Sequence, residues 1–212
     1  MDSKKTKAAG KWTAILVLVL APALAQAQSP ESAVGGNASL WAGAEVSAFN
    51  PDYSCGSDVP LGCNAQLAGP AVLFDLNVKP KWGIEGEARW LHWNGPGGQI
   101  ESNYLAGPRY RAIQYRRLNL WLKVLLGAGL ITTPNYPAAG GVKGSLFAYA
   151  PGGTAEYRLT HQLSLRGDYE FQFWPSFVGP PGFNSSGVLV EHNHGLTPNG
   201  FSLGATWRFL GR

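Results

Sequence analysis

Two glutamates separated by one residue are the clearest catalytic candidates in this sequence. Glu85 and Glu87 would point to the same face of an extended strand, and two carboxyl groups are the machinery of glycoside hydrolysis. Such an enzyme needs room for a sugar between them. The alternative is ion pairing with Arg89, Arg109 or Arg111, and we favour it because the surrounding segments predict a narrow, filled interior.

Two histidines and the absence of familiar catalytic motifs complete the chemical survey. His192 and His194, next to Glu191, would project to one side of an extended segment and resemble half of a metal site, although solvated loop residues are the simpler reading. The sequence has no Gly-x-Ser-x-Gly elbow and no phosphate-binding P-loop. We therefore predict no catalytic residue, no metal ligand and no cofactor.

The cysteines and the first residues both indicate export. Residues 4–11 carry four lysines, residues 12–24 are apolar, and residues 25–27 read Ala-Gln-Ala, so 1–27 is predicted to be a cleaved signal peptide followed by a linker over 28–38. The only two cysteines, Cys55 and Cys63, lie in a polar segment. In an oxidising compartment we expect them to form a disulfide.

Charge argues against a nucleic-acid partner. The 212 residues contain 17 basic and 13 acidic side chains, but four of the bases and one of the acids precede residue 12, which leaves 13 against 12. Only 14% of the chain is charged, 12% is aromatic, and 28 residues are glycine. This composition is unusual for a soluble enzyme and also for a disordered chain.

Hydrophobic residues recur with a period of two, which predicts strands. In 163–173 the odd positions are mostly apolar and the even positions polar, and 201–209 repeats the pattern. Eight such segments of about ten residues suit tilted strands that cross a membrane. They cover 39–49, 72–78, 82–93, 103–113, 118–126, 145–158, 163–173 and 201–209.

The connections between these segments alternate in length. Those at 79–81, 114–117 and 159–162 are short, whereas those at 50–66, 94–102, 132–144 and 175–197 are long and rich in Gly, Pro, Asn and Ser. Short turns at one end and long loops at the other are typical of a bacterial outer-membrane barrel. The predicted fold is all-β, an eight-stranded antiparallel up-and-down transmembrane barrel over 39–212.

The polar faces of the strands collect seven acids and seven bases. In a membrane barrel they would share a narrow lumen and pair there, whereas a soluble lipocalin-like carrier of apolar ligands would turn them to water. We favour the membrane barrel because the seven acids could neutralise the seven bases within a closed lumen. This predicted lumen charge network consists of Glu45, Asp75, Glu85, Glu87, Arg89, Arg109, Arg111, Lys123, Glu156, Arg158, Arg166, Asp168, Glu170 and Arg208.

Tryptophans fall into two groups under the same alternation. By parity, Trp41, Trp93, Trp121 and Trp174 face the lumen, although a bulge would turn them to the lipid interface, and both readings stay open. Other aromatics face outward and suit the girdles at the membrane interfaces. They are Trp82, Trp90, Tyr104, Tyr110, Tyr157 and Trp207.

The eight-strand layout and the closing Gly204-Ala205-Thr206-Trp207-Arg208-Phe209 resemble the OmpA-type outer-membrane β-barrel family over residues 39–210. The resemblance implies that Gly204, Trp207 and Phe209 form the assembly signal for the outer-membrane insertion machinery. In the family the phenylalanine is usually terminal, whereas here Leu210-Gly211-Arg212 follow it. The implied location is the bacterial outer membrane, with its lipid as a partner.

The expected function is non-enzymatic. The barrel would contribute to envelope structure, or bind an extracellular partner through its four long loops, since exposed loops on a rigid scaffold commonly carry recognition. The loop 175–197 contains several apolar residues that would suit a contact surface. The alternatives are a small-solute pore and a lipid A-modifying enzyme. For the enzyme, His92 is the only candidate base on the lipid face.

Overall fold

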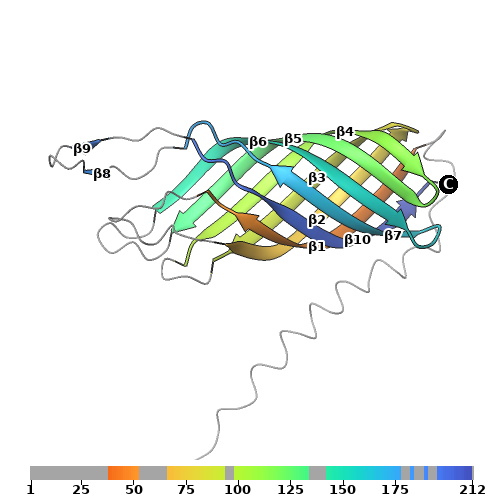
Figure 1. Ribbon diagram of the computed structural model, residues 1–212, viewed down its shortest axis with the longest axis horizontal. Helices are drawn as coiled ribbons and strands as arrows, with labels where there is room; N and C mark the ends of the chain where they lie inside the picture. The colour runs from red at the N-terminus through yellow and green to blue at the C-terminus, as the bar shows by residue number, and fades with distance from the viewer. Residues whose placement is uncertain are drawn as a thin grey trace, which may run out of the picture. The chain divides into compact units, whose positions relative to one another are not determined.

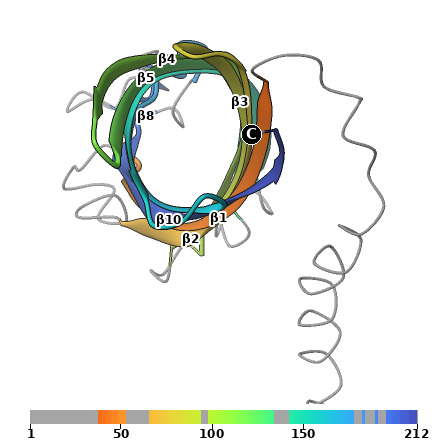
Figure 2. The same cartoon turned by 90° about the vertical axis from the view of Figure 1, so that its right-hand side faces the viewer.

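The computed structural model describes residues 38–52, 66–93, 98–133, 142–177, 182–183, 189–190 and 195–211. Eight of the described strands form one closed antiparallel barrel (Figures 1 and 2). The predicted signal peptide, almost all of the linker 28–38, and both cysteines lie outside the described residues. The barrel strands are β1 (Ser39–Asn50), β2 (Leu67–Lys79), β3 (Trp82–His92), β4 (Ile100–Tyr115), β5 (Leu118–Thr133), β6 (Val142–Arg158), β7 (Leu163–Phe171) and β10 (Asn199–Leu210).

Each barrel strand pairs with its neighbours along the chain, and the last closes on the first. The order around the barrel is β1-β10-β7-β6-β5-β4-β3-β2, and the seam between β1 and β10 runs in antiparallel register from Leu40 opposite Leu210 to Asn50 opposite Asn199. This confirms the predicted eight-stranded up-and-down barrel. No helix in the described part of the chain is long and apolar enough to cross a membrane.

Several strands extend beyond their predicted bounds. β2 begins at Leu67, β5 continues to Thr133 and β6 begins at Val142, the last two inside the connection predicted at 132–144. β4 begins at Ile100, inside the segment predicted as a loop, because Glu101 and Ser102 pair with Leu91 and Trp90 of β3. Inward Glu101 follows the polar-inward pattern of the other strands, but outward Ser102 departs from it. The long connection predicted at 175–197 contains a second, two-stranded sheet. It pairs β8 (Gly182–Phe183) with β9 (Leu189–Val190).

The barrel buries polar side chains and exposes apolar ones. Along β3 the buried positions include Glu85, Glu87 and Arg89, while Trp82 and Ile84 are exposed. Val46 and Leu203 are 70% and 71% exposed on the outside. An apolar exterior around a charged interior is the surface of a barrel embedded in a bilayer. The soluble lipocalin-like alternative is therefore wrong, and the chain is an integral membrane barrel.

Candidate functional site in the barrel interior

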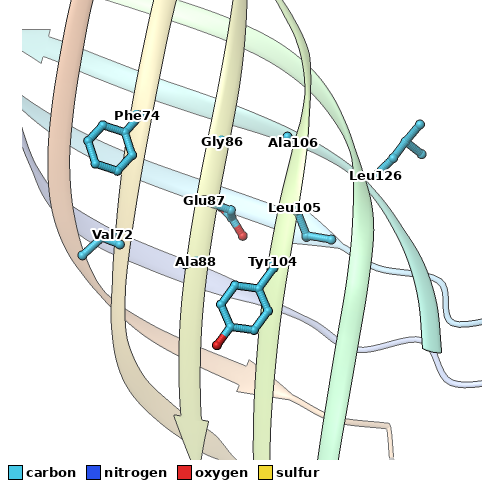
Figure 3. Close-up of a pocket in the computed structure, with 9 residues that line it drawn as sticks. All are labelled: Val72, Phe74, Gly86, Glu87, Ala88, Tyr104, Leu105, Ala106 and Leu126. Carbon is cyan, nitrogen blue, oxygen red and sulfur yellow. The ribbon is translucent and has the colours of Figure 1, made fainter. Parts of the chain in front are cut away.

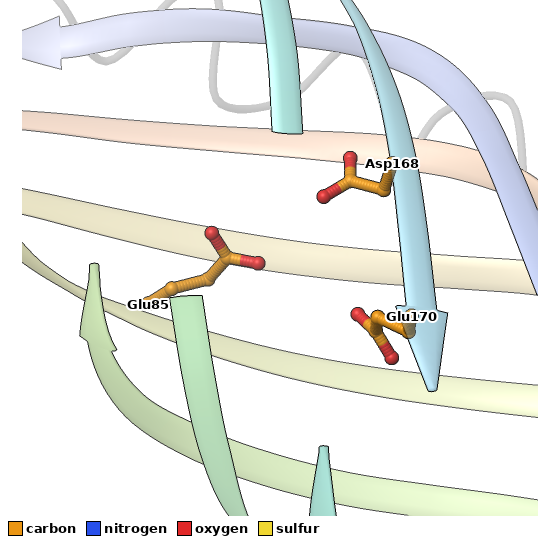
Figure 4. Close-up of side chains that lie close together, drawn as sticks. All are labelled: Glu85, Asp168 and Glu170. Carbon is orange, nitrogen blue, oxygen red and sulfur yellow. The ribbon is translucent and has the colours of Figure 1, made fainter. Parts of the chain in front are cut away.

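Lys123 is the centre of the charged interior. Its ammonium nitrogen lies 2.7 Å from a carboxylate oxygen of Glu85 on β3, 2.9 Å from one of Asp168 and 2.6 Å from one of Glu170, both on β7. Figure 4 shows Asp168 and Glu170 on the same strand, with Glu85 facing them from another. Because β5 carries the lysine, the contacts tie three strands that are not sheet neighbours.

Arg166 spans the lumen from β7 toward β1, β2 and β3. Its guanidinium lies 3.0 Å from Glu45, 2.8 Å from Asp75 and 2.6 Å from Glu85, and it also pairs with Asp168 on its own strand at 2.5 Å. A guanidinium can do this because it presents five donors in a planar fork. A lysine at this position would hold fewer partners in fixed geometry.

Arg89 and Arg109 extend the network toward the two ends. Guanidinium nitrogens of Arg89 lie 3.0 Å from carboxylate oxygens of Glu87 and of Glu170. The guanidinium carbon Cζ of Arg89 lies 4.3 Å from the centre of the Phe49 ring.

Arg109 pairs with Asp75 at 2.5 Å, and also with Glu85 and Glu156. It stacks over Trp121 at 3.9 Å. Both arginines thus have their charge neutralised by carboxylates and their flat face covered by an aromatic ring.

The carboxylates around Lys123 also meet the geometric requirement for a metal. Oxygens of Glu85, Asp168 and Glu170 lie within 4.8 Å of one another, a donor set that suits a hard cation. The ammonium of Lys123 lies within 2.9 Å of all three side chains. The position that a cation would take is therefore held by a cation of the protein itself.

Apolar side chains close the lumen on the loop side of the charged network. Trp174 is completely buried and packs with Leu105, Leu125 and Leu196, and its indole nitrogen donates to Gln172 at 3.0 Å. A Cβ at Gly129 would lie only 2.4 Å from the Trp174 ring, so this glycine makes space for it. A second buried group, Phe49, Leu67 and Leu91, packs with Trp93.

The exterior carries ordered aromatic pairs and a shallow groove. The rings of Trp82 and Tyr110 lie 4.9 Å apart, and the indole of Trp90 donates to the Tyr104 hydroxyl at 3.0 Å. Between β2 and β5 the surface is hollowed by about 420 Å³ around Gly86 (Figure 3). Its lining side chains are apolar apart from the hydroxyl of Tyr104 and the edge of Glu87. This groove faces the bilayer.

No family model and no curated protein matches the sequence. Solved structures do match. Neisserial surface protein A is 11% identical, with a TM-score of 0.60 over 81% of this chain and 99% of that chain. The chain has the eight-stranded outer-membrane β-barrel fold. Ail, the attachment invasion locus protein of Yersinia pestis, is 17% identical over 82% of this chain and 99% of that chain, with a TM-score of 0.48.

The OmpA-type resemblance is therefore confirmed as a fold, and the lipid-facing exterior agrees with the predicted outer-membrane location. Within this outer-membrane barrel, ten of the fourteen predicted lumen residues are buried in the connected network just described. Glu156 is half-buried and joins it through Arg109 and through the indole nitrogen of Trp121, at 2.8 Å. The ten are Glu45, Asp75, Glu85, Glu87, Arg89, Arg109, Lys123, Arg166, Asp168 and Glu170.

The other three predicted lumen residues lie apart. Arg111, Arg158 and Arg208 are partly or fully exposed at the end that carries the short turns, and within the described chain no salt bridge includes them. Arg111 and Arg208 instead lie over the rings of Trp121 and Trp41, at 5.6 and 5.7 Å. The expected equality of seven acids and seven bases therefore does not describe the buried layer.

Sequence reasoning missed several buried polar residues of the outer-membrane barrel. Glu101 is fully buried although it was placed in a loop, and Asn103 is buried on the same inner face. Gln172, on the predicted polar face of 163–173, is buried as that prediction requires. Ser47 and Ser202 share a hydrogen bond of 2.7 Å across the β1–β10 seam. Extending the strand parity three residues before 103 would have found Glu101.

The tryptophan alternatives are decided by burial. Trp41, Trp121 and Trp174 are buried inside the barrel, and Trp93 packs against the inner group around Phe49. All four therefore face the lumen, and no bulge turns them outward. Among the outward aromatics, Trp82, Tyr104, Tyr157 and Trp207 are exposed, as the girdle assignment requires.

The remaining chemical candidates are placed as follows. Glu85 and Glu87 are both buried and paired with cations, with no space for a sugar between them. His192, His194 and Glu191 lie outside the described residues. His92 is exposed on the lipid face. Ser102 lies on the adjacent strand β4, where it pairs with Trp90, the residue two positions before His92. In the described structure no hydrogen bond joins His92 to Ser102.

Proposed function

We propose that this protein is a closed, non-catalytic outer-membrane barrel that acts as a rigid scaffold and presents its four long connections to a partner outside the cell. One observation carries the proposal: the interior is filled in two layers, by the ion pairs around Lys123 and by the apolar group around Trp174. A filled interior leaves the outer loops as the surface on which recognition is most readily built.

The charged layer supports a sealed state over a pore. The side chains of Arg89, Arg109, Lys123 and Arg166 have no exposed surface. Opening a water path would require several buried pairs to separate together, and breaking one such pair costs about 3–5 kcal/mol. A pore would need exposed polar groups along its wall, and in the described lumen the charged side chains of this layer are buried.

The described ends of the long connections support a scaffold role. The hydroxyl of Thr197 donates to Asp52, which joins the last long connection to the first. The backbone nitrogen of Trp174 donates to the Leu196 carbonyl at 2.8 Å, and that of Gln172 to the Pro198 carbonyl at 2.7 Å. The two ends of the connection that contains β8 and β9 are thus bonded to each other, and Phe173 at its start exchanges backbone hydrogen bonds with Tyr149 of β6.

Conductance tests the closed state. We expect the refolded chain to produce no discrete current steps in a planar bilayer, because both layers block the lumen. The double variant Trp174→Ala/Arg89→Ser, which removes one large side chain from each layer, should produce measurable leak and serves as the positive control. Regular, stable steps from the unmodified protein would overturn the proposal in favour of a pore.

Loop deletion tests the binding role. Removing residues 180–194 should abolish any adhesion or autoaggregation that production of the protein confers on bacteria, while the barrel still shows a heat-dependent shift in gel mobility. The matched control removes 135–139 from another long connection. If adhesion persists without 180–194 and is lost in the control, recognition belongs to the other loop. Adhesion unaffected by either deletion would contradict a binding role for these two loops.

A further inference from the structure

Exposed positive charge gathers at one end of the barrel. Eight lysines and arginines of the described chain are not buried, and seven of them lie at the end that carries the short turns and the C-terminus, the end that faces the viewer in Figure 2. The eighth, Lys143, lies at the loop end. We call the seven residues the basic rim: Lys79, Lys81, Arg111, Arg116, Arg117, Arg158 and Arg208.

The described acids are distributed in the opposite way. Seven of them are buried in the lumen, where only four bases accompany them. Glu156, the acid nearest to the rim, is half-buried and bonded to Arg109 and Trp121. Asp52 is the single exposed acid of the described chain, and it lies at the loop end. The net charge of the chain is therefore small although its charges are separated, with an excess of acids in the interior and an excess of bases on the rim.

The turn residues of the rim lie at the depth of lipid headgroups. Lys81 directly precedes lipid-facing Trp82, and the guanidinium of Arg116 lies 5.4 Å from the ring of exposed Tyr115. Outward aromatics mark the interface between hydrocarbon and water. Basic side chains one residue beyond them extend their charged ends to the level of the phosphates.

We propose that the basic rim binds the headgroups of anionic phospholipids in the periplasmic leaflet. In an outer-membrane barrel the short turns face the periplasm, so the rim lies at that leaflet. Its exposed charges come from the β2–β3 turn (Lys79, Lys81) and the β4–β5 turn (Arg116, Arg117), with Arg158 at the β6–β7 turn. Charges distributed over successive turns match a layer of headgroups better than one converging soluble anion.

The loop end has the opposite character, which makes the preference specific to one leaflet. In sequence, the four long connections 50–66, 94–102, 132–144 and 175–197 contain the acids Asp52, Asp58 and Glu191, besides Glu101, which is buried in β4, but only one base, Lys143. They therefore lack the basic residues needed to hold phosphates of the outer leaflet.

Spin-labelled lipids test this proposal. The unmodified barrel in phosphatidylcholine vesicles at low salt should select labelled phosphatidylglycerol over labelled phosphatidylcholine by about threefold or more, because each basic group near an anionic surface contributes about fivefold in affinity at most. The variant Lys79→Gln/Lys81→Gln/Arg117→Gln should reduce the selectivity to about one. Raising the salt to about 0.5 M should have the same effect on the unmodified barrel.

Lys143→Gln is the matched control, since it removes an exposed charge at the other end and should keep the selectivity. A heat-dependent gel shift checks that each variant is folded. Selectivity that survives in the triple variant would overturn the proposal. Equal binding of both lipids by the unmodified barrel would also overturn it, and would assign the rim to a soluble anionic partner in the periplasm.

Discussion

Replacing Lys123 with methionine is expected to lower the free energy of unfolding by about 3–5 kcal/mol. The substitution keeps the length of the side chain but removes the one ammonium that lies within 3 Å of Glu85, Asp168 and Glu170. Three buried carboxylates would then face one another without this counter-charge, and unpaired buried charge is costly. Urea titration of the barrel refolded in vesicles, followed by tryptophan fluorescence, measures the change.

Two further variants serve as controls for this measurement. Lys143→Met removes an exposed lysine and should change the stability by no more than about 0.5 kcal/mol. The double variant Lys123→Met/Glu85→Gln also removes one of the carboxylates that lost its counter-charge. It should recover part of the lost free energy of unfolding, since the stability effects of substitutions at contacting residues are not additive. A single Lys123→Met variant as stable as the unmodified barrel would show that the interior is hydrated and not a packed ion-pair layer.

Replacing Gly204 with valine is expected to cost about 3 kcal/mol and to slow or prevent closure of the barrel. Gly204 lies opposite Glu45 at the seam between β1 and β10. A Cβ there would come within 2.1 Å of the Ala44 carbonyl oxygen and 2.6 Å of Cγ of Glu45. Backbone at the seam has to move apart, which weakens the pairing that closes the sheet. The yield of heat-modifiable barrel after refolding, together with urea titration, measures the effect.

Gly86 supplies the matched control, because a Cβ at this lipid-facing glycine would meet nothing within 4 Å. Gly86→Val should therefore fold normally. Refolding in detergent also separates packing from the proposed assembly signal formed by Gly204, Trp207 and Phe209, since no insertion machinery is present. If Gly204→Val refolds normally in detergent and fails only in cells, the glycine acts in recognition by that machinery and not in seam packing.

How far the sequence reaches is clearest at β3 and β7. In β7 the inward residues are all polar, in β3 they include Glu85, Glu87 and Arg89, and most of the residues between them are apolar and face outward. Alternation alone is sufficient here because the side-chain period of a strand is two, so one correctly placed residue determines the face of all the others. The same reasoning explains why strand number and turn positions follow from local pattern, whereas the orientation of the four inward tryptophans stayed open until their burial was known.

The limit of this reasoning appears at Glu101. The pattern placed the start of β4 too late because Glu101 and Ser102 are both polar, and only pairing with Leu91 and Trp90 of β3 shows that the strand already includes them. The basic rim was missed for a related reason. Arg111, Arg158 and Arg208 have the parity of lumen residues, but their height along the barrel axis places them beyond the buried layer.

By itself, then, the sequence determined the closed-barrel class and the face on which nearly every side chain lies, because both depend on local periodicity. Tertiary structure decided which charges meet. Lys123 contacts β3 and β7 across the lumen, and Arg166 reaches β1, β2 and β3. Such contacts depend on the stagger and tilt of the closed sheet, which set the height of each residue along the axis and which no single strand encodes.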